Sequence, residues 1–119
     1  MKKTLVLGAS LKPERPSYAA IRQLVKSGYE VVAIGNRSGA VCGVPIHTTL
    51  PQEEGIDTVT LYLSAANQQS YYDYILSLRP RRIIFNPGAE NPELSRIARA
   101  QQIEVLPACT LVMLAVGNY

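Results

Sequence analysis

The residues best suited to bind a ligand follow the first apolar run of the chain, in the segment Gly8–Ser17. A glycine at its start permits a tight turn of the backbone, and Ser10 supplies a hydroxyl and an amide N–H. A helix that begins at Pro16 or Ser17 presents free N–H groups, which attract an anion. The predicted phosphate-binding residues are Gly8, Ser10, Lys12, Arg15 and Ser17. The segment matches neither a Walker loop nor G-x-G-x-x-G, so an ordinary turn between a strand and a helix is the alternative.

A second polar segment, Gly35-Asn36-Arg37, ends the second apolar run. A typical NAD site has an acidic residue at this point, which holds the 2′-hydroxyl of the ribose. An arginine would instead pair with a phosphate on the ribose. The segment therefore leaves two ligand classes open, NADP with its 2′-phosphate and coenzyme A with its 3′-phosphate. A solvent-exposed turn is the structural alternative.

Two further segments, Ser64–Asn67 and Asn86–Pro92, also follow apolar runs. Small residues in the first would let an extended ligand approach the backbone, and the second offers backbone groups to a polar chain. In both segments the alternative is that the polar residues only organise the helix that follows.

Groups for acid–base, nucleophilic or metal chemistry are scarce. His47 is the only histidine and has no neighbouring partner in the sequence. Cys42 and Cys109 are too few for a disulfide framework or a cysteine-rich zinc site. No pair of acidic residues has a spacing suited to acid–base catalysis. We therefore expect no catalytic residue and no metal site, with Glu90 as the one credible base.

The apolar pattern predicts the elements that position these residues. Runs rich in Val, Ile and Leu are continuous rather than alternating, which is typical of parallel strands buried on both faces. The runs are Thr4–Leu7, Val31–Ile34, Thr58–Leu63, Ile83–Phe85 and Glu104–Leu106. Helical patterns lie between most of them, and they cover Tyr18–Lys26, Gln68–Leu78, Pro92–Gln101 and, at the end, Leu111–Val116.

Strands that alternate with helices predict an α/β fold with parallel strands and right-handed crossovers. We expect one Rossmann-like, doubly wound domain over residues 1–119, with a mainly parallel five-stranded sheet flanked by helices. The segment Gly39–Pro51 is broken by glycine and proline, and it is expected to be a loop with a short strand near Val44–His47. Ligands of such sheets bind beyond the carboxyl ends of the strands, where the polar segments begin.

Length and charge narrow the classes of function. A chain of 119 residues is sufficient for one domain with its own core. Residues 1–40 hold seven basic residues against two acidic ones, so an anionic ligand is expected to face this third of the chain. A protein that binds nucleic acid typically has a dense basic stripe with exposed aromatic residues, and the sequence shows neither. No apolar run is long enough for a signal peptide or a membrane span, so the cytoplasm is the expected location.

Several segments, in this order along the chain, resemble the small stand-alone CoA-binding proteins, which look like the nucleotide-binding domain of the succinyl-CoA synthetase α subunit. The segments are Gly8-Ala9-Ser10, Pro13–Ser17, Gly28-Tyr29-Glu30-Val31, Asn86–Asn91 and Ala108-Cys109-Thr110. The resemblance covers essentially the whole chain, which makes it far more specific than any single loop. It implies a Rossmann-like fold that binds coenzyme A.

The resemblance also implies a role for each matched residue. Gly8, Ser10 and Arg15 would hold phosphates; Gly35, Asn36 and Arg37 would lie at the adenosine end; Ser64 and Ala65 would line the middle; and Pro87, Gly88 and Glu90 would flank pantetheine. The synthetase subunit has a second domain with a phosphorylated histidine, for which this sequence has no counterpart, so the resemblance extends to binding and not to the ligase reaction.

We therefore expect a protein that binds coenzyme A or an acyl-CoA as a small-molecule partner, without evident catalysis. Two alternatives stay open. In the first, the chain is the CoA-site component of a multi-protein acyl-CoA enzyme, in which an unidentified protein partner supplies the reactive groups. In the second, it is an NADP-binding module.

Overall fold

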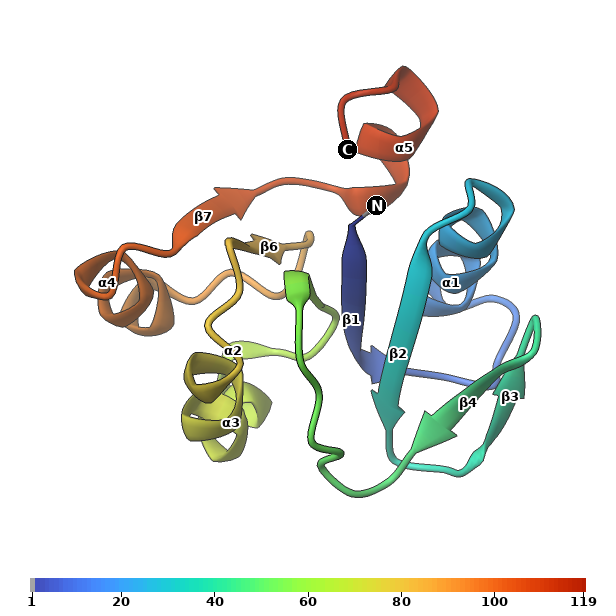
Figure 1. Cartoon of the computed structure of the whole chain (residues 1–119), viewed down its shortest axis with the longest axis horizontal. Helices are drawn as coiled ribbons and strands as arrows, with labels where there is room; N and C mark the ends of the chain where they lie inside the picture. Colours follow the sequence, from blue (N-terminus) through green and yellow to red (C-terminus); the bar gives the residue numbers. More distant parts are fainter. Residues whose placement is uncertain (1) are drawn as a thin grey trace.

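A seven-stranded sheet forms the centre of the computed structural model, which describes residues 2–119 (Figure 1). In chain order the strands are β1 (Lys3–Ala9), β2 (Glu30–Gly35), β3 (Gly39–Val41), β4 (Val44–His47), β5 (Ile56–Leu61), β6 (Arg82–Phe85) and β7 (Glu104–Pro107). Their order across the sheet is β3-β4-β2-β1-β5-β6-β7. Only the pair β3–β4 is antiparallel among these strands, so the prediction of a mainly parallel α/β sheet is confirmed.

Helices cover both faces of the sheet. They are α1 (Pro16–Lys26), α2 (Ala65–Gln68), the 3-10 turn η1 (Gln69–Tyr71), α3 (Tyr72–Ser77), α4 (Pro92–Ala100) and α5 (Thr110–Val116). One face packs against α1 and α5, and the other against the segments α2 to α4 (Figure 1). This arrangement is the doubly wound architecture that alternating strands and helices predict.

Strand β1 shows why its apolar run is continuous. Leu5 and Leu7 point into the core that contains Ile75 of α3, whereas Val6 points into the core that contains Ile21 of α1. All three β1 side chains are fully buried. A strand with a helical layer on each face has no solvent side, and therefore shows no alternation of polar and apolar residues.

The prediction of five strands is wrong, because the segment after β2 forms a hairpin. The short strand expected near Val44–His47 is present as β4, and it pairs in parallel with β2. Its partner β3 has three residues, and the two strands are joined by a turn in which Cys42 has φ 49° and Gly43 has φ 80°. Positive φ at both central residues is the geometry that joins antiparallel strands with least distortion.

The single helix expected over Gln68–Leu78 is also divided. The helical path begins at Ala65, tightens into η1 and continues as α3. Because of this early start, Gln68 lies within the first helical segment rather than at its beginning. No helix among residues 2–119 is both long enough and apolar enough to cross a membrane.

Candidate functional site

A groove opens at the carboxyl edge of the sheet, above the point where the strand order reverses. The chain leaves β1 for β2 on one side and later returns to β5 on the other side. The loops that follow the two sides of such a reversal diverge and leave a crevice between them. Here the loops after β1, β2, β5 and β6 line a groove of about 560 Å³.

Two glycines let the loops of this groove come close together. Gly8 has φ +99°, and a Cβ on it would lie 3.0 Å from the carbonyl carbon of Tyr62. A Cβ on Gly35 would lie 2.3 Å from the carbonyl oxygen of Ala9. The ends of β1, β2 and β5 therefore approach one another because neither position carries a side chain.

The loop after β1 forms a compact turn at the start of α1. The amide of Lys12 donates to Ser10 Oγ at 3.1 Å, and the amide of Arg15 donates to the carbonyl of Lys12 at 3.0 Å. Pro16 is the first helical residue and has no N–H. The next two amides after Ser17 both donate to the Arg15 carbonyl. Within the described chain this leaves the Ser17 amide as the helix N–H without a backbone acceptor.

The groove concentrates positive charge. Lys12, Arg15 and Arg37 line it, all three are exposed, and no aspartate or glutamate is among the lining residues. None of the three forms an ion pair with any part of residues 2–119. Cations that form no ion pair in a concave site raise the local concentration of an anionic ligand.

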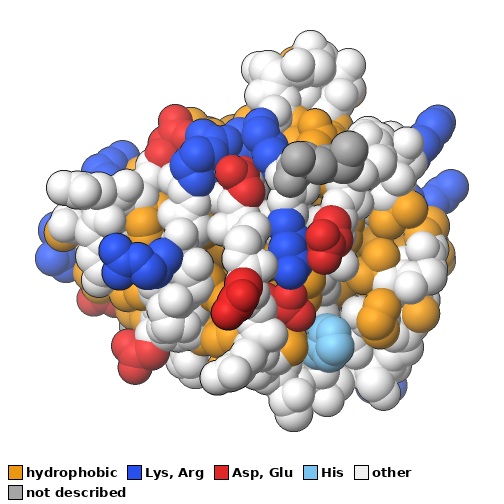
Figure 2. Space-filling model, viewed as in Figure 1, with side chains coloured by type: hydrophobic (Ala, Val, Ile, Leu, Met, Phe, Trp, Pro, Cys, Tyr) orange, Lys and Arg blue, Asp and Glu red, His pale blue; other side chains and the backbone are white. Residues whose placement is uncertain are grey.

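Two basic residues at the amino edge of the sheet, Lys3 and Arg81, are paired with acids. Figure 2 shows acidic and basic side chains intermingled over the middle and upper part of one face. On Lys3, Nζ lies 2.7 Å from the carboxylate of Glu53. The guanidinium of Arg81 lies 3.0 Å from Asp57 and 3.6 Å from Glu104. Positive charge on these residues is therefore largely balanced in place.

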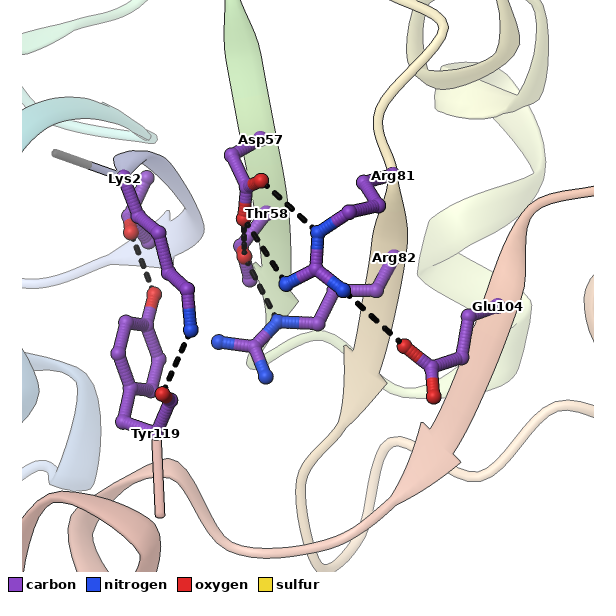
Figure 3. Close-up of polar contacts among 8 residues, drawn as sticks. Lys2, Asp57, Thr58, Arg81, Arg82, Glu104 and Tyr119 are labelled. Carbon is purple, nitrogen blue, oxygen red and sulfur yellow. Dashed lines mark hydrogen bonds and ion pairs between the residues drawn. The ribbon is translucent and has the colours of Figure 1, made fainter. Parts of the chain in front are cut away.

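A polar cluster at the opposite, amino edge of the sheet has a structural role (Figure 3). Arg82 is only 4% exposed, and its Nε donates to Thr58 Oγ1 at 2.8 Å. Its guanidinium lies 4.5 Å from the ring centroid of Tyr119, whose hydroxyl is hydrogen-bonded to Thr4. Lys2 Nζ donates to the backbone carbonyl of Tyr119 at 2.6 Å. Burial, followed by repulsion from Arg82, lowers the pKa of Lys2. These contacts fasten the segment after α5 to the sheet.

The structure brings eleven of the thirteen sequence-predicted site residues together around the groove. They are Gly8, Ser10, Lys12, Arg15, Ser17, Gly35, Asn36, Arg37, Ser64, Pro87 and Gly88. Ala65 and Glu90 do not line the groove. The Glu90 carboxylate instead accepts a hydrogen bond from the Gly88 amide at 2.9 Å and borders a smaller hollow of about 260 Å³ beside α4.

A family model described as a CoA binding domain matches residues 2–115. The chain belongs to this CoA-binding family. A crystal structure of an uncharacterized protein is 49% identical, covers 100% of this chain and 98% of its own, and has a TM-score of 0.97. No curated protein sequence matches the chain.

More distant structures share the fold. A protein from Thermus thermophilus is 24% identical, with 99% of this chain and 90% of that one covered and a TM-score of 0.86. A dinucleotide-forming acetyl-coenzyme A synthetase from Ca. Korarchaeum cryptofilum, in complex with phosphate and ADP, is 18% identical with a TM-score of 0.72. That match covers 90% of this CoA-binding family member and 25% of the synthetase chain.

Sequence reasoning missed several residues of the groove and its support. Leu11, Tyr62, Asn67 and Tyr71 line the groove without having been predicted. Behind it, Asn86 is 2% exposed and forms three hydrogen bonds. Its Nδ2 donates to Thr60 Oγ1 and to the carbonyl of Leu61, and its Oδ1 accepts from the Thr110 amide. An asparagine directly after a buried strand is the one sequence signal that points to such a role.

The groups with most chemical reactivity lie apart from the groove or are held inert. Neither His47 nor either cysteine lines it. Cys42 is exposed in the hairpin turn, and Cys109 precedes the first residue of α5. The Tyr62 hydroxyl is buried without a hydrogen-bond partner in the described chain, and burial raises the pKa of Tyr62 to about 12. A tyrosine with that pKa stays protonated at neutral pH.

Proposed function

We propose that this chain binds coenzyme A or an acyl-CoA in the groove and does not itself catalyse a reaction on it. The observation that carries the proposal is the charge of the groove, where Lys12, Arg15 and Arg37 form no ion pair within residues 2–119 and no acidic residue lines the wall. Coenzyme A carries a diphosphate and a 3′-phosphate, and both need cations or backbone N–H groups. Membership of the CoA-binding family supports the same ligand.

In this proposal the ligand lies across the sheet, from the loop after β2 to the loop after β6. The diphosphate lies on the turn Ser10–Ser17, and Arg37 pairs with the 3′-phosphate. The pantetheine arm extends past Asn67 toward Pro87 and Gly88. Strands β2 and β6 are three strand positions apart, which is roughly 14 Å. An extended ligand such as coenzyme A suits that span.

The absence of catalysis is proposed from the residues that line the groove. They include no histidine, cysteine, aspartate or glutamate. Hydrolysis of a thioester requires an activated nucleophile or a general base with a positioned water. Glu90, the base that the sequence favoured, is hydrogen-bonded to the Gly88 amide outside the groove. A role as the CoA-site component of a larger enzyme is compatible with the same groove, because the acetyl-coenzyme A synthetase carries this fold in 25% of its chain.

Isothermal titration calorimetry with coenzyme A, dephospho-CoA, NADP and NAD tests the proposal. We expect coenzyme A to bind at least about tenfold more tightly than NAD, because an arginine stands where an NAD site has an acid. Equal affinities would contradict it, and a preference for NADP over coenzyme A would favour the NADP-binding alternative. A thermal-shift series gives an independent check, since a ligand at 100 times its dissociation constant adds about 2.7 kcal/mol of stability.

A further inference from the structure

A buried glutamine joins two walls of the groove. Gln68 of α2 is completely buried, and its Nε2 donates to the carbonyl oxygens of Leu63 at 2.8 Å and Ala89 at 2.7 Å. Leu63 belongs to the loop after β5 and Ala89 to the loop after β6, and both residues line the groove. A single side-chain amide therefore joins the two loops by one hydrogen bond to each.

The other side of the same amide is held as well. Gln68 Oε1 accepts a hydrogen bond from Asn91 Nδ2 at 2.9 Å. Asn91 is 4% exposed, and its Oδ1 accepts from the Leu94 amide at 3.1 Å, which caps the start of α4. Both N–H groups of Gln68 thus have carbonyl acceptors and its Oε1 has an N–H donor, so the amide has a single favourable orientation. A continuous chain of hydrogen bonds runs from α4 through Gln68 to the groove.

The Gln68 amide controls the distance between the carbonyl oxygens of Leu63 and Ala89. The two N–H bonds of a planar amide form a rigid fork, so the separation of the two carbonyls is set by the covalent geometry of the side chain. Water does not reach Gln68, and a buried carbonyl that loses its donor is costly. An apolar side chain of the same volume would fill the space between the loops but would not hold their carbonyls at this spacing.

We propose that Gln68 is a positioning residue that sets the spacing of the pantetheine end of the groove. The proposal rests on the proposed function, which places the pantetheine arm between the loops after β5 and β6. The nucleotide end is formed by the loops after β1 and β2, and Gln68 has no hydrogen bond to either loop. Loss of the Gln68 amide therefore weakens binding of the arm and leaves binding of the nucleotide end in place.

The test compares Gln68→Met with Gln69→Met, which changes the neighbouring and exposed glutamine in the same way. Calorimetry measures coenzyme A and adenosine 3′,5′-bisphosphate, which has a nucleotide end but no pantetheine arm. For Gln68→Met we expect coenzyme A to bind about tenfold more weakly or worse, and the bisphosphate to bind within about twofold of wild type. For Gln69→Met both affinities should equal those of wild type.

A second variant keeps the proposal testable if Gln68→Met does not fold. Asn91→Asp retains the oxygen that caps Leu94 and replaces the N–H donor to Gln68 Oε1 with a second acceptor, so it should show the same selective loss. An equal loss of both ligands, or unchanged affinity for coenzyme A, would overturn the positioning role. Failure of the wild-type protein to bind coenzyme A at all would overturn the proposed function, and is distinguishable because it needs no variant.

Discussion

Replacement of Arg37 by alanine should weaken binding of coenzyme A but hardly affect dephospho-CoA. Arg37 follows β2, lines the groove and has no acidic partner in residues 2–119. A hydrogen bond between charged groups contributes about 1.5–3 kcal/mol. The guanidinium is exposed, so water and salt screen part of this interaction. We expect the free energy of binding coenzyme A to weaken by about 1.5 kcal/mol, which is roughly a tenfold higher dissociation constant.

The same substitution at Arg15 should behave differently. Arg15 immediately precedes α1, where the proposed diphosphate lies, and both ligands contain that diphosphate. Arg15→Ala should therefore weaken coenzyme A and dephospho-CoA by a similar factor. Arg22→Ala is the matched control, because Arg22 is exposed on α1 outside the groove and its loss changes the net charge equally.

Calorimetry of the wild type and the three variants with both ligands, at about 0.1 M salt, separates contact from long-range attraction. If Arg37→Ala loses both ligands equally, the 3′-phosphate has been placed at the wrong end of the groove. If Arg22→Ala weakens binding as much as Arg37→Ala, the overall charge rather than a direct contact governs affinity.

Three further outcomes follow from the packing and chemistry of the groove. Gly35→Ala should lower the free energy of unfolding in urea by about 1–3 kcal/mol, because its Cβ would lie 2.3 Å from the Ala9 carbonyl oxygen; unchanged stability would show that β1 and β2 separate easily. Tyr62→Phe should be at least as stable as wild type at pH 8, since it removes a buried hydroxyl without a partner. The pKa of Tyr62 is about 12 in the folded state and 10 ordinarily, so above pH 10 the unfolded chain ionises first and the free energy of unfolding falls. By pH 11 the free energy of unfolding of the wild type in urea should have fallen about 1.4 kcal/mol more than that of Tyr62→Phe. The wild-type chain should release no free CoA from acetyl-, succinyl- or longer acyl-CoA, and turnover of about 1 per second or more that is abolished in Glu90→Gln would make it an enzyme.

The sheet and the position of the groove were predictable because they depend on local patterns. A run such as Ile83-Ile84-Phe85 is buried on both faces as β6, and its continuity is a direct consequence of the two helical layers. The carboxyl ends of parallel strands meet at one edge, so the segments that follow them were expected to assemble. Lys12, Arg15 and Arg37 belong to two such segments and do meet at the groove.

The remaining features depend on contacts that the apolar pattern does not predict. Strand β3 has the residues Gly39-Ala40-Val41, which show no strand pattern, and it is stabilised by its pairing with β4. Gln68 was expected to be an ordinary helix residue, but its side chain meets the carbonyl of Ala89, 21 positions further along. Glu90 was expected beside the ligand, but it turns back to the Gly88 amide. The contact of Gln68 joins residues far apart in the chain, whereas those of β3 and Glu90 are local, and apolar periodicity encodes none of them.

Lys12, Arg15 and Arg37 all belong to the basic first third of the sequence, but a count of charges along the chain does not explain why these three form no ion pair. Lys3 belongs to the basic first third and yet is neutralised by Glu53, which lies in the later, more acidic part. Folding thus pairs Lys3 and Arg81 with acids at the amino edge of the sheet and leaves Lys12, Arg15 and Arg37 at the carboxyl edge without an ion pair in residues 2–119. A field that attracts a phosphorylated ligand arises from this separation and not from the net charge of +3. Affinity for coenzyme A should therefore fall with added salt far more steeply than the small net charge suggests, because the unpaired groove cations act together at short range.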